Sequence, residues 1–216
     1  MTIGAVLFDL DGTLVDSLED LTDAVNYMLA DVGQAALGPS EVRQLVGKGA
    51  RNLVQRALAT NSAEALNRGL AAFTEFNTLH ITDKSRLYPG VLKLLQQLAA
   101  DGIRMAVISN KNEALSRLIL KALEIDTYFD MIAGGDTFAE MKPSPLPLRR
   151  VIATFNCSAR DVVMVGDSIN DIQAGNLAGI ATIGCTWGYG SRRELSEAGF
   201  LADSCSDIIT ILQSWD

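Results

Sequence analysis

Two aspartates stand two positions apart directly after an apolar run near the start of the chain. The segment AVLFDLDGT places Asp9 and Asp11 immediately beyond Phe8. Side chains at positions i and i+2 of an extended chain point to the same face, so the two carboxylates should converge while Leu10 faces away. Two like charges about 4 Å apart repel by about 4 kcal/mol at an effective dielectric constant of about 20. A positive charge must therefore offset this repulsion.

Three further stretches carry polar side chains after apolar runs. The segment AVISN ends on Ser109 and Asn110, MKPSPLPL contains Lys142, and VMVGDSIND supplies Asp167 and Asp171. Each stretch taken alone also fits a helix N-cap or a turn. Taken together, they deliver carboxylates, a hydroxyl and an ammonium to the edge of a parallel sheet where open α/β folds bind ligands.

This set of side chains indicates phosphoryl chemistry. A divalent cation held among Asp9, Asp11 and Asp167 would cancel their repulsion and leave room for an anionic substrate, and Lys142 would add a further positive charge. Magnesium is the expected ion, because it prefers carboxylate and phosphate oxygens. Asp9 is then an ionised nucleophile that can attack phosphorus. Asp11 can protonate the leaving oxygen and later activate water. The hydroxyl of Ser109 can hold the transferring group.

Composition excludes several other classes. The chain has 216 residues, of which 48% are hydrophobic and 20% charged, as in an ordinary globular protein. No apolar run reaches the length of a membrane span. A net charge of −8 argues against partners such as nucleic acid or membranes. His80 is the only histidine, which disfavours Ser-His-Asp and Cys-His catalysis. Three scattered cysteines predict free thiols and a cytoplasmic location.

Strand-like and helix-like patterns alternate over most of the chain. Apolar runs predict strands at residues 3–8, 104–109, 129–133, 162–165 and 181–185. Amphipathic segments between them predict helices. This alternation predicts an α/β fold with a Rossmann-like, doubly wound parallel sheet.

One stretch interrupts the alternation. Between about Val15 and Arg86 only helical patterns appear, beginning at a Ser17 N-cap and a stripe that stops at Gly33, with further helices expected at 40–46, 50–59 and 62–81. Seventy residues exceed what a strand crossover needs. We therefore expect a catalytic core of residues 1–14 and 87–216 and an inserted helical cap domain of residues 15–86.

The four motifs DLDGT, ISN, KPSP and GDSIND resemble, in order and spacing, those of haloacid dehalogenase superfamily phosphatases. The resemblance implies a Rossmann-like core, magnesium and an aspartyl-phosphate intermediate. It implies that Asp9 is the nucleophile and that Asp11 is the acid/base. Because dehalogenases of the superfamily lack this second aspartate, the resemblance favours phosphoryl transfer.

The resemblance also implies further site residues. Metal ligands would be Asp9, the backbone carbonyl of Asp11, and Asp167, with Asp171 in support. Lys142 would bind phosphate, and the implied substrate contacts are Thr13, Ser109 and Asn110.

The helical insertion resembles the small C1 cap of phosphoglycolate phosphatases in this superfamily. Its segment VGKGA at residues 46–50 is similar to their substrate loop, so Lys48 could reach a substrate carboxylate. Alternatively, Gly47 ends a helix and Lys48 is solvated. His80, Trp187 and Tyr189 are expected to have packing or surface roles.

The leading interpretation is a magnesium-dependent phosphomonoesterase acting on a small anionic metabolite, with 2-phosphoglycolate as the best single substrate. The nearest alternative is another capped phosphatase for sugar phosphates or pyrophosphate, or a β-phosphoglucomutase-like phosphomutase. A non-catalytic receiver-like module, phosphorylated on aspartate, is the alternative of a different class, although such modules lack a large cap. A monomer or homodimer is expected.

Overall fold

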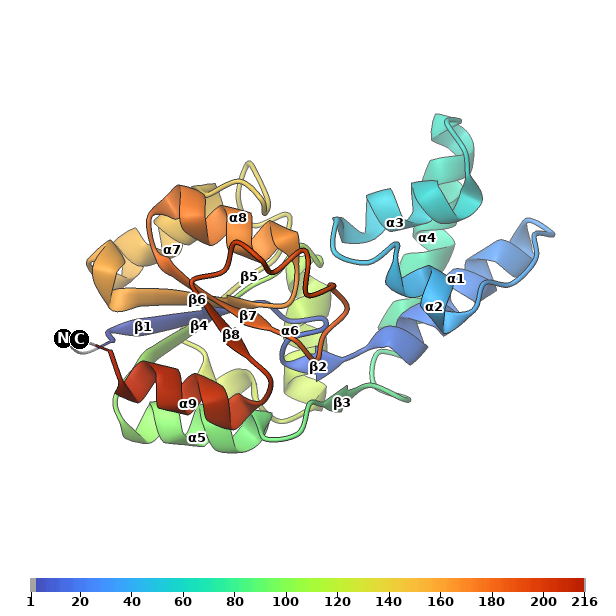
Figure 1. The fold of residues 1–216 in the computed structure, drawn as a ribbon. Coiled ribbons are helices and arrows are strands. Elements are labelled where there is room, and N and C mark those ends of the chain that lie inside the picture. Colours follow the sequence, from blue (N-terminus) through green and yellow to red (C-terminus); the bar gives the residue numbers. More distant parts are fainter. Residues whose placement is uncertain (1–2, 216) are drawn as a thin grey trace.

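The computed structural model describes residues 3–215, which form a core built on one sheet and a helical insertion beside it (Figure 1). Every pairing in the six-stranded sheet is parallel, and the strand order is β5-β4-β1-β6-β7-β8. The strands are β1 (Ala5–Phe8), β4 (Arg104–Ile108), β5 (Met131–Ala133), β6 (Val162–Gly166), β7 (Ala181–Cys185) and β8 (Phe200–Ala202). The predicted fold class is confirmed.

Helices cover both faces of this sheet because the central strands are apolar on both sides. Side chains of β1 alternate, with Leu7 packed in the cluster of α7 (Leu146–Phe155) and α8 (Ile169–Ala178). Phe8 packs in the cluster of α5 (Val91–Ala100), α6 (Glu113–Ala122) and α9 (Cys205–Gln213) on the other face. Short 3-10 helices η1 (Asp126–Tyr128) and η2 (Ala159–Asp161) precede β5 and β6. Because the six strands are parallel, all of them end at the same edge of the sheet, and this edge faces the insertion (Figure 1).

The insertion has a hydrophobic cluster of its own. It contains α1 (Leu18–Asp31), α2 (Pro39–Arg43), α3 (Gly49–Leu58) and α4 (Ala63–Leu79). Met28, Val54 and Phe73 are buried in this cluster. The chain leaves and re-enters the core through two short antiparallel strands, β2 (Val15–Asp16) and β3 (Arg86–Leu87). The buried residues of the insertion thus form a cluster separate from the two clusters that flank the sheet.

Sequence patterns missed three of the strands. β2 and β3 have two residues each, too few to show a periodicity. In β8, two of the three residues are exposed, so no apolar run marks it. Ser17 precedes α1 as predicted, but its side chain makes no cap hydrogen bond and instead donates to Asp11. None of the helices within residues 3–215 combines the length and apolar character that crossing a membrane requires.

Candidate active site

Asp9 and Lys142 form a buried ion pair at the carboxyl end of β1. The backbone N–H of Asp9 donates to the carbonyl of Val165 on β6, which fixes the residue over the centre of the sheet. Lys142 Nζ lies 2.9 Å from Asp9 Oδ1 and 2.6 Å from Asp171 Oδ1. The side chain of Lys142 is 1% exposed. This ammonium supplies part of the positive charge that the clustered carboxylates require.

Asp167 and Asp171 reach the same point from the turn between β6 and α8. Asp171 Oδ2 accepts hydrogen bonds from the backbone N–H and the hydroxyl of Ser168, at 3.0 and 2.7 Å, and so caps α8. Its other oxygen is thereby directed at Lys142. Carboxylate oxygens of Asp9, Asp167 and Asp171 all lie within 4.8 Å of one another. Three acids from two distant segments thus meet in one buried cluster.

Burial and charge repulsion raise the pKa values of two of these residues, Asp9 and Asp167. Burial, followed by the charge of Asp171, raises the pKa of Asp9 to about 8 despite the opposing effect of Lys142. Burial and Asp171 also raise the pKa of Asp167 to about 6. Burial opposes the charged form of Lys142, but Asp171 and Asp9 outweigh it and raise the pKa of Lys142 above its ordinary value. A bound cation would favour the ionised carboxylates.

The donor set of this cluster fits a hard divalent cation. All the contributing atoms are carboxylate oxygens, which is the ligand type that magnesium prefers. Asp9 Oδ1 is buried and has no hydrogen-bond donor within residues 3–215, because the nearby Lys142 ammonium is not aligned as one. A buried carboxylate oxygen without a hydrogen-bond donor is suited to bind a metal ion.

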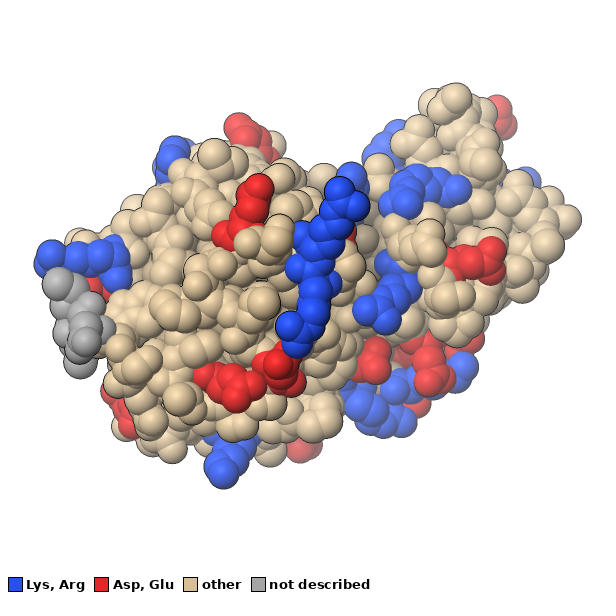
Figure 2. Space-filling model, in the orientation of Figure 1, with Lys and Arg blue, Asp and Glu red and all other residues tan. Residues whose placement is uncertain are grey.

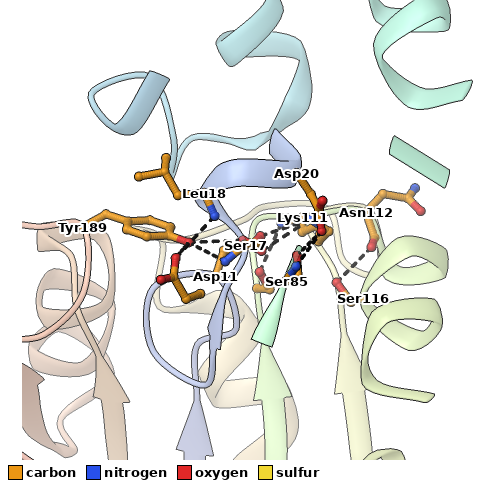
Figure 3. A network of polar contacts seen from close by, with 11 residues as sticks. Asp11, Ser17, Leu18, Asp20, Ser85, Lys111, Asn112, Ser116 and Tyr189 are labelled. Carbon is orange, nitrogen blue, oxygen red and sulfur yellow. Dashed lines mark hydrogen bonds and ion pairs between the residues drawn. The ribbon is translucent and has the colours of Figure 1, made fainter. Parts of the chain in front are cut away.

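Asp11 lines the same two cavities as Asp9 but has different partners. Its Oδ1 accepts a hydrogen bond of 2.5 Å from the hydroxyl of Ser17, and Lys111 Nζ lies 3.4 Å from both of its oxygens (Figure 3). The phenol of Tyr189 accepts a hydrogen bond from the backbone N–H of Ser17 and extends this network. The carboxylate of Asp11 therefore lies outside the three-acid cluster and is held by Ser17 and Lys111 instead.

Thr13 and the segment WGYG at residues 187–190 hold Asp167 in place. Thr13 Oγ1 donates to Asp167 Oδ1 at 3.0 Å, and the backbone N–H of Tyr189 donates to Oδ2 at 2.6 Å. A Cβ atom at Gly188 would collide with Asp167 and with the carbonyl of Gly12. The loop can approach this closely only because position 188 is glycine. Thr13 lines neither cavity described below.

Ser109 and Asn110 follow β4, next to β1 in the sheet, as the sequence predicts. Ser109 is anchored through its backbone N–H, which donates to the carbonyl of Ala133 on β5. The Asn110 amide donates to the carbonyls of Lys142 and Gly47, at 2.8 and 2.9 Å. The amide of Asn170 also donates to Gly47, at 3.1 Å. The Asn110 side chain therefore ties two loops together at the site.

Two cavities meet at Asp9 and Asp11, where the insertion covers the end of the sheet. The inner pocket has a volume of about 50 Å³, and its lining includes Asp9, Asp11, Leu53, Phe73, Asn77 and Lys111. The outer cleft has a volume of about 670 Å³, and its lining includes Asp9, Asp11, Arg43, Lys48, Arg56 and Asp167. Asp9 and Asp11 are thus accessible both from the wide outer cleft and from the narrow inner pocket.

Lysine and arginine side chains lie on both sides of the gap between the core and the insertion (Figure 2). Lys48 is exposed and belongs to the outer cleft. Arg43 of α2 donates to the backbone carbonyls of Gly188 and Tyr189, at 2.6 and 2.8 Å. Basic residues of the insertion therefore both line the approach to the site and join the two parts of the molecule.

Several of these contacts were not predicted. The sequence predicts a packing or surface role for Tyr189 and no role for Lys111, Asn77 and Arg43. The segment WGYG follows β7, a neighbour of β6 in the sheet, so its position at the carboxyl edge is a signal that could have found it. His80, expected to pack or lie at the surface, stacks on Phe76 at α4 and pairs with Asp83.

The sequence profile of the family described as haloacid dehalogenase-like hydrolase matches residues 6–185. The phosphoglycolate phosphatase of Neisseria meningitidis is 40% identical over 200 residues, which cover 90% of this chain and 85% of that protein. Phosphoglycolate phosphatase 1 of Pseudomonas aeruginosa is 39% identical, with coverage of 94% and 78%. The crystal structure of a predicted phosphoglycolate phosphatase from Haemophilus somnus superposes with a TM-score of 0.93 at 32% identity, covering 98% of each chain.

Proposed function

The chain belongs to the haloacid dehalogenase-like hydrolase family, and we propose that it is a phosphomonoesterase that hydrolyses 2-phosphoglycolate to glycolate and phosphate. The names of its relatives at about 40% identity support this substrate. The observation that carries the proposal is the buried cluster of Asp9, Asp167 and Asp171 around Lys142. Such a cluster provides a carboxylate nucleophile beside positive charge, as phosphoryl transfer to a protein side chain requires.

The reaction has two steps on the side chains of this protein. A carboxylate oxygen of Asp9 attacks phosphorus, the bond from phosphorus to the ester oxygen breaks, and Asp11 donates a proton to the departing glycolate. Asp11, now ionised, takes a proton from water, whose oxygen attacks the phosphorus of the aspartyl-phosphate. The bond from phosphorus to Asp9 breaks, which releases phosphate and restores both aspartates.

Magnesium is the metal that we propose for the cluster. Asp9, Asp167 and the backbone carbonyl of Asp11 would hold it, and Asp171 would support the set through Lys142. When bound, the ion supplies positive charge to the phosphate oxygens. Thr13 and the 187–190 loop keep Asp167 oriented toward this place.

Ser109 and Lys142 are proposed to bind the transferring phosphoryl group. Thr13 and Asn110 stay predicted substrate contacts. The Lys142 ammonium is already in place before substrate arrives, since it is fixed between Asp9 and Asp171. Such fixed charges stabilise a transition state without reorganisation. Lys48, in the outer cleft, remains a predicted contact for the anionic substrate on its way to Asp9.

We propose that residues 15–86 act as a cap over the site. The carbonyl of Gly47 accepts hydrogen bonds from two core asparagines, Asn110 and Asn170. Arg43 adds two hydrogen bonds to the 187–190 loop. These contacts hold the insertion against the carboxyl edge of the sheet, and closure of the outer cleft over a bound substrate would exclude water from the reacting groups.

The location and assembly of the protein are also proposals. The thiols Cys157, Cys185 and Cys205 are unpaired, which fits a reducing cytoplasm. We expect a monomer or homodimer without nucleic-acid or membrane partners, and light scattering on the purified protein would test this expectation.

Initial rates on a panel of phosphate esters test the proposed function. We expect the highest kcat/KM for 2-phosphoglycolate in the presence of magnesium, and much lower values for sugar phosphates and pyrophosphate. Isomerisation of a sugar phosphate without net phosphate release would instead favour a phosphomutase. A stable aspartyl-phosphate without turnover would favour a receiver-like module.

A further inference from the structure

Lys111 is a buried ammonium with spare hydrogen-bonding capacity. Its side chain is 7% exposed, and within residues 3–215 its Nζ has one ion-pair partner, Asp11, at the long distance of 3.4 Å. A lysine ammonium has three donors, and burying it without partners is costly. Lys111 lines the inner pocket, so its remaining donors are available to an acceptor placed there.

Asn77 approaches the same pocket from the insertion. It lies on α4, is 2% exposed and lines the inner pocket. An asparagine amide offers two donors and an acceptor. The core and the insertion therefore each contribute a largely buried polar side chain to this pocket.

The remaining wall of the pocket combines apolar side chains with Ser109, Asn110 and Asn112. Leu21, Leu53, Phe73 and Leu115 line it together with the polar groups. The volume of the pocket, about 50 Å³, is much smaller than that of the outer cleft, about 670 Å³. A short substituent such as the carboxymethyl part of 2-phosphoglycolate therefore suits this pocket better than a sugar ring does.

Lys111 also lies on the side of the site where the leaving group must be. Asp11, the proposed proton donor to the ester oxygen, is its ion-pair partner. If Asp11 protonates the ester oxygen, the carbon attached to that oxygen would come close to Lys111. Lys48 is exposed in the wide outer cleft, where water and salt weaken its attraction for an anion.

We propose that Lys111 and Asn77 bind the carboxylate of the substrate in the inner pocket and thereby select small carboxylated phosphate esters. This inference rests on the proposed phosphomonoesterase activity. Lys111 would form a charge-assisted hydrogen bond with the carboxylate, and Asn77 would donate a second one from the insertion. A carboxylated substrate would in this way join the insertion to the core on the leaving-group side.

The ratio of kcat/KM for 2-phosphoglycolate to kcat/KM for ethyl phosphate measures this recognition. The two esters have the same carbon count and differ in the carboxylate. We expect Lys111→Gln to lower the ratio by about 10- to 100-fold, the usual worth of a hydrogen bond to a charged group. Asn77→Asp should lower it further, because the new carboxylate repels that of the substrate. Matched changes at exposed positions, Lys121→Gln on α6 and Asn67→Asp on α4, should leave the ratio unchanged.

Each outcome has a distinct meaning. If Lys111→Gln slows both esters equally, Lys111 only supports Asp11 and the inference is wrong, while the proposed function stands. A ratio that falls in Lys48→Gln but not in Lys111→Gln would place the carboxylate in the outer cleft and also overturn it. A wild-type protein that hydrolyses neither ester would contradict the proposed function itself. Thermal unfolding of each folded variant separates loss of recognition from loss of structure.

Discussion

Lys142 Nζ lies 2.9 Å from Asp9 Oδ1, in a site where the two side chains are 1% and 13% exposed. The same ammonium lies 2.6 Å from Asp171, so one ammonium faces two carboxyl groups, with a third, that of Asp167, close by. Ionisation of all three carboxyl groups would leave excess negative charge in a buried place. This imbalance explains why a cation should bind there and why the protein should depend on it.

Replacing Asp9 by asparagine should abolish turnover. The amide is not a nucleophile, so kcat should fall by more than about 10³-fold. Steady-state rates on 2-phosphoglycolate check this expectation. The same change at Asp101, an exposed residue at the end of α5, is the matched control. Retention of even a tenth of the wild-type rate in Asp9→Asn would remove Asp9 from the nucleophile role.

Replacing Asp11 by asparagine should slow both chemical steps while the metal still binds. General acid-base groups contribute about 10²- to 10⁴-fold, and kcat should fall by this amount. The Asp11 carboxylate lies outside the cluster of Asp9, Asp167 and Asp171, so the increase in Tm produced by magnesium should persist. Steady-state rates measure the expected loss of kcat, and thermal unfolding of the same variant measures whether magnesium still raises its Tm. Wild-type turnover would rule out the acid/base role.

Replacing Thr13 by valine should weaken metal binding. The change keeps the shape but removes the hydrogen bond to Asp167 Oδ1. Loss of a residue that orients a metal ligand typically costs 10- to 100-fold in metal affinity. The magnesium concentration for half-maximal activity should rise accordingly. Thr78→Val on the exposed side of α4 is the control. If only KM for substrate rises at saturating magnesium, Thr13 contacts the substrate instead.

The stabilisation by magnesium should increase with pH. The folded, metal-free protein holds protons on Asp9 and Asp167 up to about pH 8 and about pH 6, whereas the unfolded chain releases them near pH 4. The stability of the metal-free protein is therefore highest below pH 4 with respect to these groups, and falls as pH rises through 6 and 8. Metal competes with those protons, so its effect grows over the same range.

Thermal unfolding in EDTA and in magnesium chloride, at pH 5.5 and pH 8.5, measures this dependence. The difference in Tm between the two conditions should be several degrees larger at pH 8.5. Asp9→Asn, which removes the group with the higher pKa, should flatten the dependence above pH 6. An equal difference at both pH values would contradict the account.

Sequence patterns predict the sheet and its polar edge well because each signal is local. Continuous apolar runs mark β1, β4, β6 and β7, and the acids of the site follow two of these strands directly. Parallel strands must then bring Asp9 and Asp167 to one edge. The strand predicted at 129–133 begins only at Met131, and β8 was not predicted because two of its three residues are exposed and form no apolar run.

The parts that escaped prediction depend on contacts between distant segments. Lys111 has no role predicted from the sequence, yet its side chain is 7% exposed and lines a pocket shared by the core and the insertion. Tyr189 reads as a packing residue, yet its backbone N–H orients Asp167, which lies 22 positions earlier. Asn77 carries no motif at all. Tertiary placement, rather than residue type, gives these three their roles.

Trapping of the phosphorylated side chain tests the central claim most directly. Protein quenched with acid during turnover of 2-phosphoglycolate and then treated with borohydride should carry homoserine at position 9, because borohydride reduces an acyl phosphate to an alcohol. Peptide mass spectrometry reads the position. The account predicts this product at Asp9, dependent on substrate and absent from Asp9→Asn. Rapid turnover with no reduced residue, or with the product at another aspartate, would contradict it.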